Sequence, residues 1–241
     1  MTLLAHHHTP GASPTIIFLP GYRSDMQGSK VLAMEAWARD RGQAFLRFDY
    51  AGCGESPGDF EDQTLASWRD DALGMIHTVV EGPVVLVGSS MGGWLMLLVA
   101  RARPERVVGM VGIAAAPDFT RWGFTDAEKA TLVKEGRLEQ PSDYGPEPMV
   151  TTLNFWTSGE ANLVLEAPIG FDGPVRLLQG QRDAEVPWEL ALRLADTLRS
   201  DDVQVTLVKG GDHRLSRDAD IRLLLRATED VLIACSSPSS C

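Results

Sequence analysis

The stretch VVLVGSSMGGW, from Val84 to Trp94, decides the fold of this chain. Its four leading apolar residues predict a buried strand, and the apolar run 94–103 predicts a buried helix. Between them, Gly88 to Gly92 form a G-x-S-x-G motif centred on Ser90. On such a sharp strand-to-helix turn flanking side chains would clash, and the serine hydroxyl projects above the sheet. Ser90 is therefore the candidate nucleophile; Ser89 lacks a glycine two residues away on both sides.

Short apolar runs alternate with helical patterns on both sides of this motif. The runs are continuous rather than alternating, which predicts burial on both faces and a mostly parallel sheet. Strand-helix alternation predicts a doubly wound α/β fold. The predicted strands are 16–19, 44–48, 84–87, 107–113, 175–179 and 203–208, and the predicted helices are 29–41, 65–79, 94–103, 188–199 and 218–235.

One interval, about 118–172, breaks the alternation because no strand is predicted in it. A structureless loop of that length is uncommon in a compact domain. The interval is rich in aromatic and aliphatic residues, Tyr144 among them. We therefore expect a small, mostly helical cap insertion over the sheet edge where ligands bind, within a single domain spanning 1–241. Its apolar residues could line an acyl pocket or form the insertion's own core.

Composition excludes several classes of protein. The chain has 241 residues, 44% hydrophobic and 23% charged, the ordinary mix of a folded globular protein. Its formal net charge of −11 would be repelled by phosphate backbones, so nucleic acid is not an expected partner. No apolar run approaches the roughly 18 residues of a membrane span, so stable membrane insertion is not expected.

Sequence features that this chain lacks lead to expectations about its compartment and its cofactors. Three scattered cysteines do not make a disulfide framework, and no secretory signal is visible, which predicts a cytoplasmic protein. There is no Gly-rich dinucleotide loop and no metal-ligand cluster, so neither a cofactor nor a metal is expected. His6 to His8 are expected to belong to a flexible tail.

A serine nucleophile needs a base, and His213 is the candidate. It directly follows the predicted strand 203–208, and in a parallel sheet such loops lie on the side of the nucleophile turn. The acid that orients the histidine is expected to be Asp183, which gives the chain order Ser, Asp, His. Glu185 and Asp212 are the rival acids.

Acyl transfer also needs donors for the developing oxyanion. One is the backbone N–H of Met91, the residue after the nucleophile. The second is expected from the loop after the strand 16–19, where the Tyr22 amide is the best candidate. The tyrosine ring is then free for another task, such as lining an acyl pocket, and Arg23 to Asp25 are expected to brace the loop.

Together these elements resemble the α/β-hydrolase superfamily over nearly the whole chain. Three segments, 18–26, 47–56 and 211–216, are similar to a branch of mitochondrial acyl-protein thioesterases and acyl-glucuronide esterases and to their bacterial homologues. The resemblance implies hydrolysis of S-palmitoyl cysteine thioesters or acyl glucuronides, with Ser90, Asp183 and His213 as the triad. No transit peptide is visible, so mitochondrial targeting is not expected to carry over.

Three functional hypotheses follow. The first is a serine hydrolase that cleaves thioesters or esters through an acyl-enzyme, with a small-molecule ester or thioester, or an acylated protein, as its partner. The second is a small-molecule carboxylesterase of the acyl-glucuronide esterase type. The third, a non-catalytic ligand-binding homologue, predicts a broken triad, whereas all three members are present in this sequence.

Overall fold

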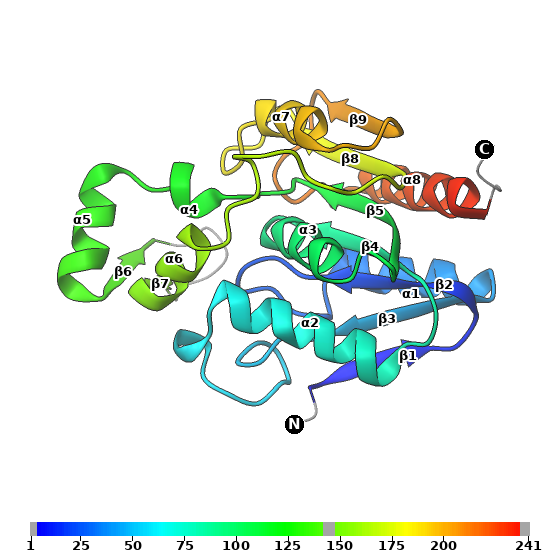
Figure 1. Cartoon of the computed structure of the whole chain (residues 1–241), viewed down its shortest axis with the longest axis horizontal. Helices are drawn as coiled ribbons and strands as arrows, with labels where there is room; N and C mark the ends of the chain where they lie inside the picture. The colour runs from blue at the N-terminus through cyan, green and yellow to red at the C-terminus, as the bar shows by residue number, and fades with distance from the viewer. Residues whose placement is uncertain (1–3, 142–147, 237–241) are drawn as a thin grey trace.

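A computed structural model of the chain describes residues 4–141 and 148–236. Its centre is a seven-stranded sheet in the order β1-β3-β2-β4-β5-β8-β9 (Figure 1). The neighbours from β3 to β9 pair in parallel, and β1 runs antiparallel to β3 at one edge. The predicted mostly parallel α/β sheet is confirmed. The strands are β1 (His6–Thr9), β2 (Ala12–Leu19), β3 (Gln43–Phe48), β4 (Val84–Ser89), β5 (Val107–Ile113), β8 (Val175–Gly180) and β9 (Val203–Val208).

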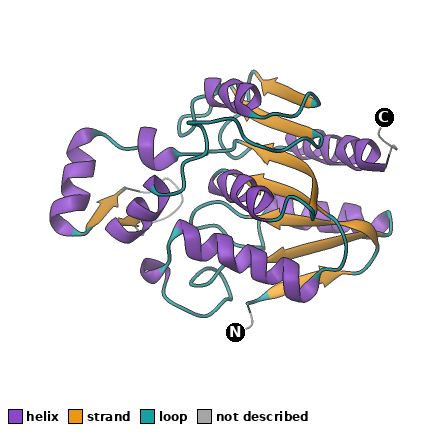
Figure 2. Cartoon of the chain, in the orientation of Figure 1, coloured by secondary structure: helices purple, strands orange, loops and turns teal. Residues whose placement is uncertain are grey.

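Helices cover both faces of the sheet (Figure 2). Because successive side chains of a strand point to opposite faces, Ile16 and Phe18 pack with the helices of one face and Ile17 and Leu19 with those of the other. The first face carries α1 (Ser29–Asp40) and α8 (Asp218–Ser236), and the second carries α2 (Leu65–Val79), α3 (Met91–Ala102) and α7 (Glu189–Thr197). Burial on both faces explains the continuous apolar runs of the inner strands.

The edge strand β9 differs from the inner strands. Its side chains alternate between half-buried and exposed, with Gln204 and Thr206 exposed to solvent. The expectation of burial on both faces is therefore wrong for this outermost strand: Val203, Val205 and Val208 pack against the cores, whereas Gln204 and Thr206 lie in solvent.

The N-terminal histidines are not a flexible tail, since His6–Thr9 form β1. His7 Nδ1 lies 2.9 Å from Glu35 Oε1, and the Thr9 hydroxyl donates to the same oxygen at 3.1 Å. The other oxygen of Glu35 accepts from Arg47 Nε at 2.9 Å. These contacts join β1, α1 and β3. A four-residue polar strand has no hydrophobic period by which the sequence could reveal it.

Residues 118–172, which we call the insert, leave the sheet after β5 and return to it at β8. Figure 1 shows the insert beyond one end of the sheet. It contains two paired antiparallel strands, so the expectation that no strand lies here is wrong. Its elements are α4 (Phe119–Trp122), α5 (Asp126–Glu135), β6 (Arg137–Gln140), β7 (Met149–Thr152) and α6 (Leu153–Glu160). Tyr144 lies outside the described residues, as does Cys241, one of the three cysteines of the chain.

The two ends of the insert are held together by Asp118. Its two carboxylate oxygens accept from the amides of Val164 and Leu165, each at 2.9 Å. Between these two ends of the insert, the ring of Phe155 lies 5.6 Å from that of Trp68 on α2, centroid to centroid. Phe155 is 1% exposed and belongs to the core shared with the sheet. The insert therefore packs its aromatic side chains against the main body and not only against itself.

Candidate active site

Ser90 stands at the turn between β4 and α3 with φ of 54°, a left-handed conformation that is strained for a serine. Three backbone hydrogen bonds hold it there. Its N–H donates to the Ile113 carbonyl at 2.9 Å, and its own carbonyl accepts from the amides of Gly93 at 2.8 Å and Ala116 at 3.1 Å. The turn is thus fixed to the neighbouring strand β5 and to the residues that follow it.

The glycines of the motif allow a close approach of backbones. A Cβ on Gly88 would overlap the backbone of Gly92, and a Cβ on Gly92 would overlap the carbonyl groups of Leu19 and Pro20. The first turn of α3 therefore lies directly against β4 and the end of β2. This contact brings the loop after β2 beside the nucleophile.

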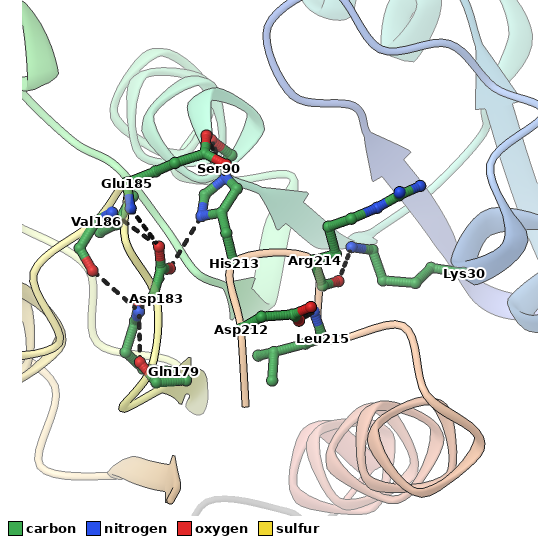
Figure 3. Close-up of polar contacts among 11 residues, drawn as sticks. Lys30, Ser90, Gln179, Asp183, Glu185, Val186, Asp212, His213, Arg214 and Leu215 are labelled. Carbon is green, nitrogen blue, oxygen red and sulfur yellow. Dashed lines mark hydrogen bonds and ion pairs between the residues drawn. The ribbon is translucent and has the colours of Figure 1, made fainter. Parts of the chain in front are cut away.

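The imidazole of His213, in the loop after β9, lies between Ser90 and Asp183 (Figure 3). Its Nε2 is 3.1 Å from Ser90 Oγ, and its Nδ1 is 2.9 Å from Asp183 Oδ2. Because a carboxylate can only accept, Nδ1 carries the proton and Nε2 is left to accept from the serine hydroxyl. The structure thus brings the three predicted residues together, although they are far apart in the sequence.

The side chain of Asp183 is buried, with 0% of its surface exposed. Its Oδ1 accepts from the amides of Glu185 and Val186, each at 2.9 Å, and its Oδ2 accepts from Gln179 Nε2 at 2.9 Å as well as from His213. Burial raises the pKa of Asp183, but the hydrogen bonds from His213 and Val186 outweigh it and hold that pKa below its usual value. The carboxylate is therefore charged where it faces the imidazole.

The two rival acids, Asp212 and Glu185, occupy other positions around His213. Asp212 accepts from the amide of Leu215 at 3.0 Å and so closes the turn that carries His213. Glu185 is half exposed, and its Oε2 lies 3.6 Å from Nε2 of His213, the nitrogen that faces Ser90. Lys30 of α1 donates to the carbonyl of Arg214 and ties the same turn to α1 (Figure 3).

The two predicted amide donors lie in segments that adjoin Ser90. Met91 is the first residue of α3, where an amide has no carbonyl four residues earlier within the helix. A Cβ on Gly21, the residue before Tyr22, would lie 3.3 Å from the Cβ of Ser90. The loop that carries Tyr22 therefore passes directly beside the nucleophile.

Side chains of this loop also reach the insert. The Tyr22 hydroxyl donates to the carbonyl of Val150 at 2.7 Å, and Arg23 Nη1 donates to the carbonyl of Pro148 at 2.5 Å. The ring of Tyr22 packs against that of Phe155, with centroids 4.9 Å apart. Arg23 thus braces the loop, as expected, and the tyrosine ring packs in the aromatic core.

A hollow of about 190 Å³ opens beside this loop. One of its walls, Ser24, lies close to Ser90, because both side chains are within 4 Å of the place where Gly21 would carry a Cβ. The hollow is smaller than the roughly 300–1,000 Å³ of ordinary small-molecule pockets. It is lined by Arg23, Ser24, Asp25, Gly52, Cys53, Gly54 and Phe60.

Two residues at the site escaped the sequence reasoning, Gln179 and Lys30. Gln179 had a visible signal, because it is a polar residue in an otherwise apolar strand end, LLQG. Lys30 had none, since its contact with the turn at Arg214 depends on how α1 packs. Within 4–141 and 148–236, no group of three or more His, Cys, Asp or Glu side chains is arranged to hold a metal ion.

Comparison with known proteins shows which family the whole chain resembles. The model of the alpha/beta hydrolase family matches residues 16–233. The chain is 42% identical to the mitochondrial palmitoyl-protein thioesterase ABHD10 of Homo sapiens over 95% of its own length and 76% of that protein. Its structure resembles mouse alpha/beta hydrolase domain-containing protein 10, with a TM-score of 0.89, 40% identity and coverage of 96% and 94%. A crystal structure of a protein from Agrobacterium vitis S4 is similarly close, with a TM-score of 0.89, 41% identity and coverage of 94% and 92%.

The comparisons correct one expectation. The ABHD10 relatives that match 95% of the chain, from five mammals, are all named mitochondrial proteins. The expected cytoplasmic location is therefore wrong, because these relatives point to mitochondria. In the described ranges, no helix combines the length and apolar character needed to cross a bilayer.

Proposed function

The chain belongs to the alpha/beta hydrolase family and is a hydrolase of esters or thioesters, and on this premise we propose that Ser90, Asp183 and His213 carry out the reaction. The observation that supports these roles is the continuous relay of hydrogen bonds, 3.1 Å from Ser90 Oγ to His213 Nε2 and 2.9 Å from His213 Nδ1 to Asp183. A non-catalytic homologue would not need this geometry.

The reaction begins with formation of an acyl-enzyme. Nε2 of His213 takes the proton of Ser90 as Oγ attacks the carbonyl carbon of the substrate. The negative charge moves to the carbonyl oxygen, where the amides of Tyr22 and Met91 stabilise it. As the tetrahedral intermediate collapses, the imidazolium returns its proton to the departing thiol or alcohol, and the acyl group remains on Ser90.

Water then completes the cycle. His213 removes a proton from a water molecule, and the water oxygen attacks the acyl carbon. As the second tetrahedral intermediate collapses, the imidazolium returns the proton to Ser90 Oγ, which restores the hydroxyl and releases the carboxylic acid. Asp183 keeps its negative charge throughout. The buried carboxylate fixes the imidazole orientation and stabilises the imidazolium that forms in each half of the cycle.

For the substrate we propose an S-acylated cysteine, with palmitoyl as the acyl group. The name of the ABHD10 relatives supports this assignment, since the identity extends over 95% of the chain. We also propose that the insert acts as the cap of the site, because its strand β7 is bonded to the loop beside Ser90. An acyl chain would then meet the insert on its way to the nucleophile.

A second candidate substrate class is small oxygen esters, including acyl glucuronides. The hollow of about 190 Å³ supports it, because its wall contains polar side chains and one of them, Ser24, lies near Ser90. The two classes share the triad and differ only in the groups that surround the substrate.

A fluorophosphonate probe tests the assignment of Ser90. We expect the probe to modify the wild-type protein and to leave Ser90→Ala unmodified, with Ser89→Ala as the matched control that still reacts. Equal labelling of wild type and Ser90→Ala would contradict the proposal. Turnover of a palmitoyl thioester and of a short oxygen ester, measured in parallel, then separates the two substrate classes by their kcat/KM.

A further inference from the structure

Gln179 occupies an unusual place for an uncharged polar side chain. It lies in β8, whose six residues are all buried, and is itself 1% exposed. Its Nε2 donates to Oδ2 of Asp183 at 2.9 Å, which is the carboxylate oxygen that also faces His213 (Figure 3). The side chain therefore runs from the strand to the back of the proposed relay.

The surroundings of the amide decide which of its atoms faces Asp183. Besides the carboxylate, the carbonyls of Gly180 at 3.3 Å and Val186 at 3.4 Å face Nε2. All three groups are acceptors, so a rotated amide would place its oxygen against three oxygens. The nitrogen is therefore the atom that belongs at this position.

This orientation leaves Oε1 of Gln179 buried without a hydrogen-bond partner among the described residues. A buried acceptor that lacks a partner carries the full cost of losing water. An apolar residue of similar length would avoid that cost within an apolar strand. Stability alone therefore does not favour glutamine here, and the amide donor toward Asp183 is the gain that offsets the cost.

We propose that Gln179 is a positioning residue that holds the Asp183 carboxylate in register with His213. The inference rests on the proposed roles of the triad. Two amides hold Oδ1, and Gln179 is the donor that shares Oδ2 with the imidazole. That donor gives Oδ2 a hydrogen bond that does not depend on the imidazole, so Oδ2 stays in place when His213 shifts or changes its charge during the reaction.

The test replaces Gln179 by methionine, which keeps the unbranched shape and removes both polar atoms. We expect kcat to fall by about 10-fold, the effect of one lost hydrogen bond to a charged group, with KM within about twofold of wild type. The matched control is Gln204→Met on the exposed face of β9, which should change neither constant. An unchanged kcat in Gln179→Met would overturn the proposal.

A double-mutant cycle separates positioning from a merely structural role. If Gln179 acts through the Asp183 carboxylate, Gln179→Met should add less than about twofold to the loss caused by Asp183→Asn. A further 10-fold loss in that background would overturn the proposal. Should Gln179→Met fail to fold, Gln179→Leu takes its place, and failure of both to fold assigns Gln179 a structural role instead.

The outcome is distinguishable from failure of the proposed function itself. If Ser90→Ala keeps full turnover, the triad assignment fails whatever Gln179 does. If Ser90→Ala is inactive while Gln179→Met has the wild-type kcat, only the inference about Gln179 fails.

Discussion

The hydroxyl of Tyr22 donates a hydrogen bond of 2.7 Å to the carbonyl oxygen of Val150 and so joins the loop beside the nucleophile to strand β7 of the insert. Tyr22 is also the residue whose amide we assign to the oxyanion. The next residue, Arg23, has φ of 53° and is itself bonded to Pro148. The position of the amide therefore depends on the position of the insert.

Replacement of Tyr22 by phenylalanine removes the bond to Val150 and keeps the ring and the backbone amide. We expect kcat to fall by about three- to tenfold and the free energy of unfolding to fall by about 1 kcal/mol, because one buried carbonyl loses its donor. Steady-state kinetics and denaturant titration measure the two effects. If both quantities match wild type, the insert and the loop are not coupled through this bond.

The two carboxylates near His213 should differ greatly in their effect on catalysis. Asp183→Asn should reduce kcat by about 1,000-fold or more, since it removes the charge at Nδ1 and disturbs the tautomer. Glu185→Gln should change kcat by less than about 10-fold, because Glu185 is 3.6 Å from the other nitrogen and 46% exposed. The kinetic constants of both variants on one substrate check the ranking, and a larger loss in Glu185→Gln would reverse the assignment.

Gly92→Ala tests the close approach of α3 to the end of β2. The added methyl group would overlap the carbonyls of Leu19 and Pro20, so we expect a loss of about 2–3 kcal/mol in stability and at least about 100-fold in kcat. Gly28→Ala is the control, because its Cβ would have only ordinary contacts. Thermal unfolding and turnover measure both variants; a stable and active Gly92→Ala would show that the backbones can separate without cost.

Much of this site could be predicted because its signals are local. Ser90 is marked by glycines within two residues, and His213 and Asp183 each follow a strand that a short apolar run reveals. The parallel direction of β4, β8 and β9 supplies the rest, since it puts the loops at their carboxyl ends on the same side of the sheet.

Other features could not be predicted because they depend on packing. The strands β1, β6 and β7 have four residues each, too few to show a period, and β1 consists of polar side chains held by Glu35. The direction of the Gln179 amide depends on where the loop 180–186 lies in space. The cytoplasmic expectation failed because scattered cysteines and the absence of a secretory signal do not distinguish the cytoplasm from mitochondria.

Glu35 and Arg47 form a buried ion pair, with side chains 10% and 9% exposed. Glu35→Gln should lower stability by about 2–3 kcal/mol at pH 7, because it leaves the Arg47 charge without a counterion. Burial raises the pKa of Glu35, but hydrogen bonds and charge from Arg47 lower it below its usual value. The stabilisation is therefore present above the unfolded-state pKa of about 4.5 and is lost as pH falls through the lower folded-state pKa.

Denaturant titrations of wild type and Glu35→Gln between pH 3 and 7 check this. The difference in the free energy of unfolding should shrink toward acid. A difference that stays constant or grows below pH 4.5 would contradict the role of the ionised carboxylate.

Lys30 gives stability a dependence on pH of the same sign, but in the alkaline range. Burial and the nearby charge of Arg214 lower the pKa of Lys30 from 10.5 to about 8. Between these two values the unfolded chain binds more protons than the folded chain, so stability rises with pH. Relative to Lys30→Met, the wild-type free energy of unfolding should therefore increase by about 2 kcal/mol from pH 7 to pH 10. Lys209→Met, at an exposed position, is the control for loss of a lysine.

The insert leaves and rejoins the sheet at two strands, β5 and β8, that are bonded directly to each other. The hydrogen bonds between β5 and β8 are therefore made without the insert, and Asp118 joins the two ends of the insert through the amides of Val164 and Leu165. The sheet and the loops that carry Ser90, Asp183 and His213 thus form one unit, to which the insert is added as a second. Changes in the length or the side chains of the insert therefore leave the hydrogen bonds between β5 and β8 intact, provided that the contacts of Tyr22 and Arg23 with Val150 and Pro148 are kept.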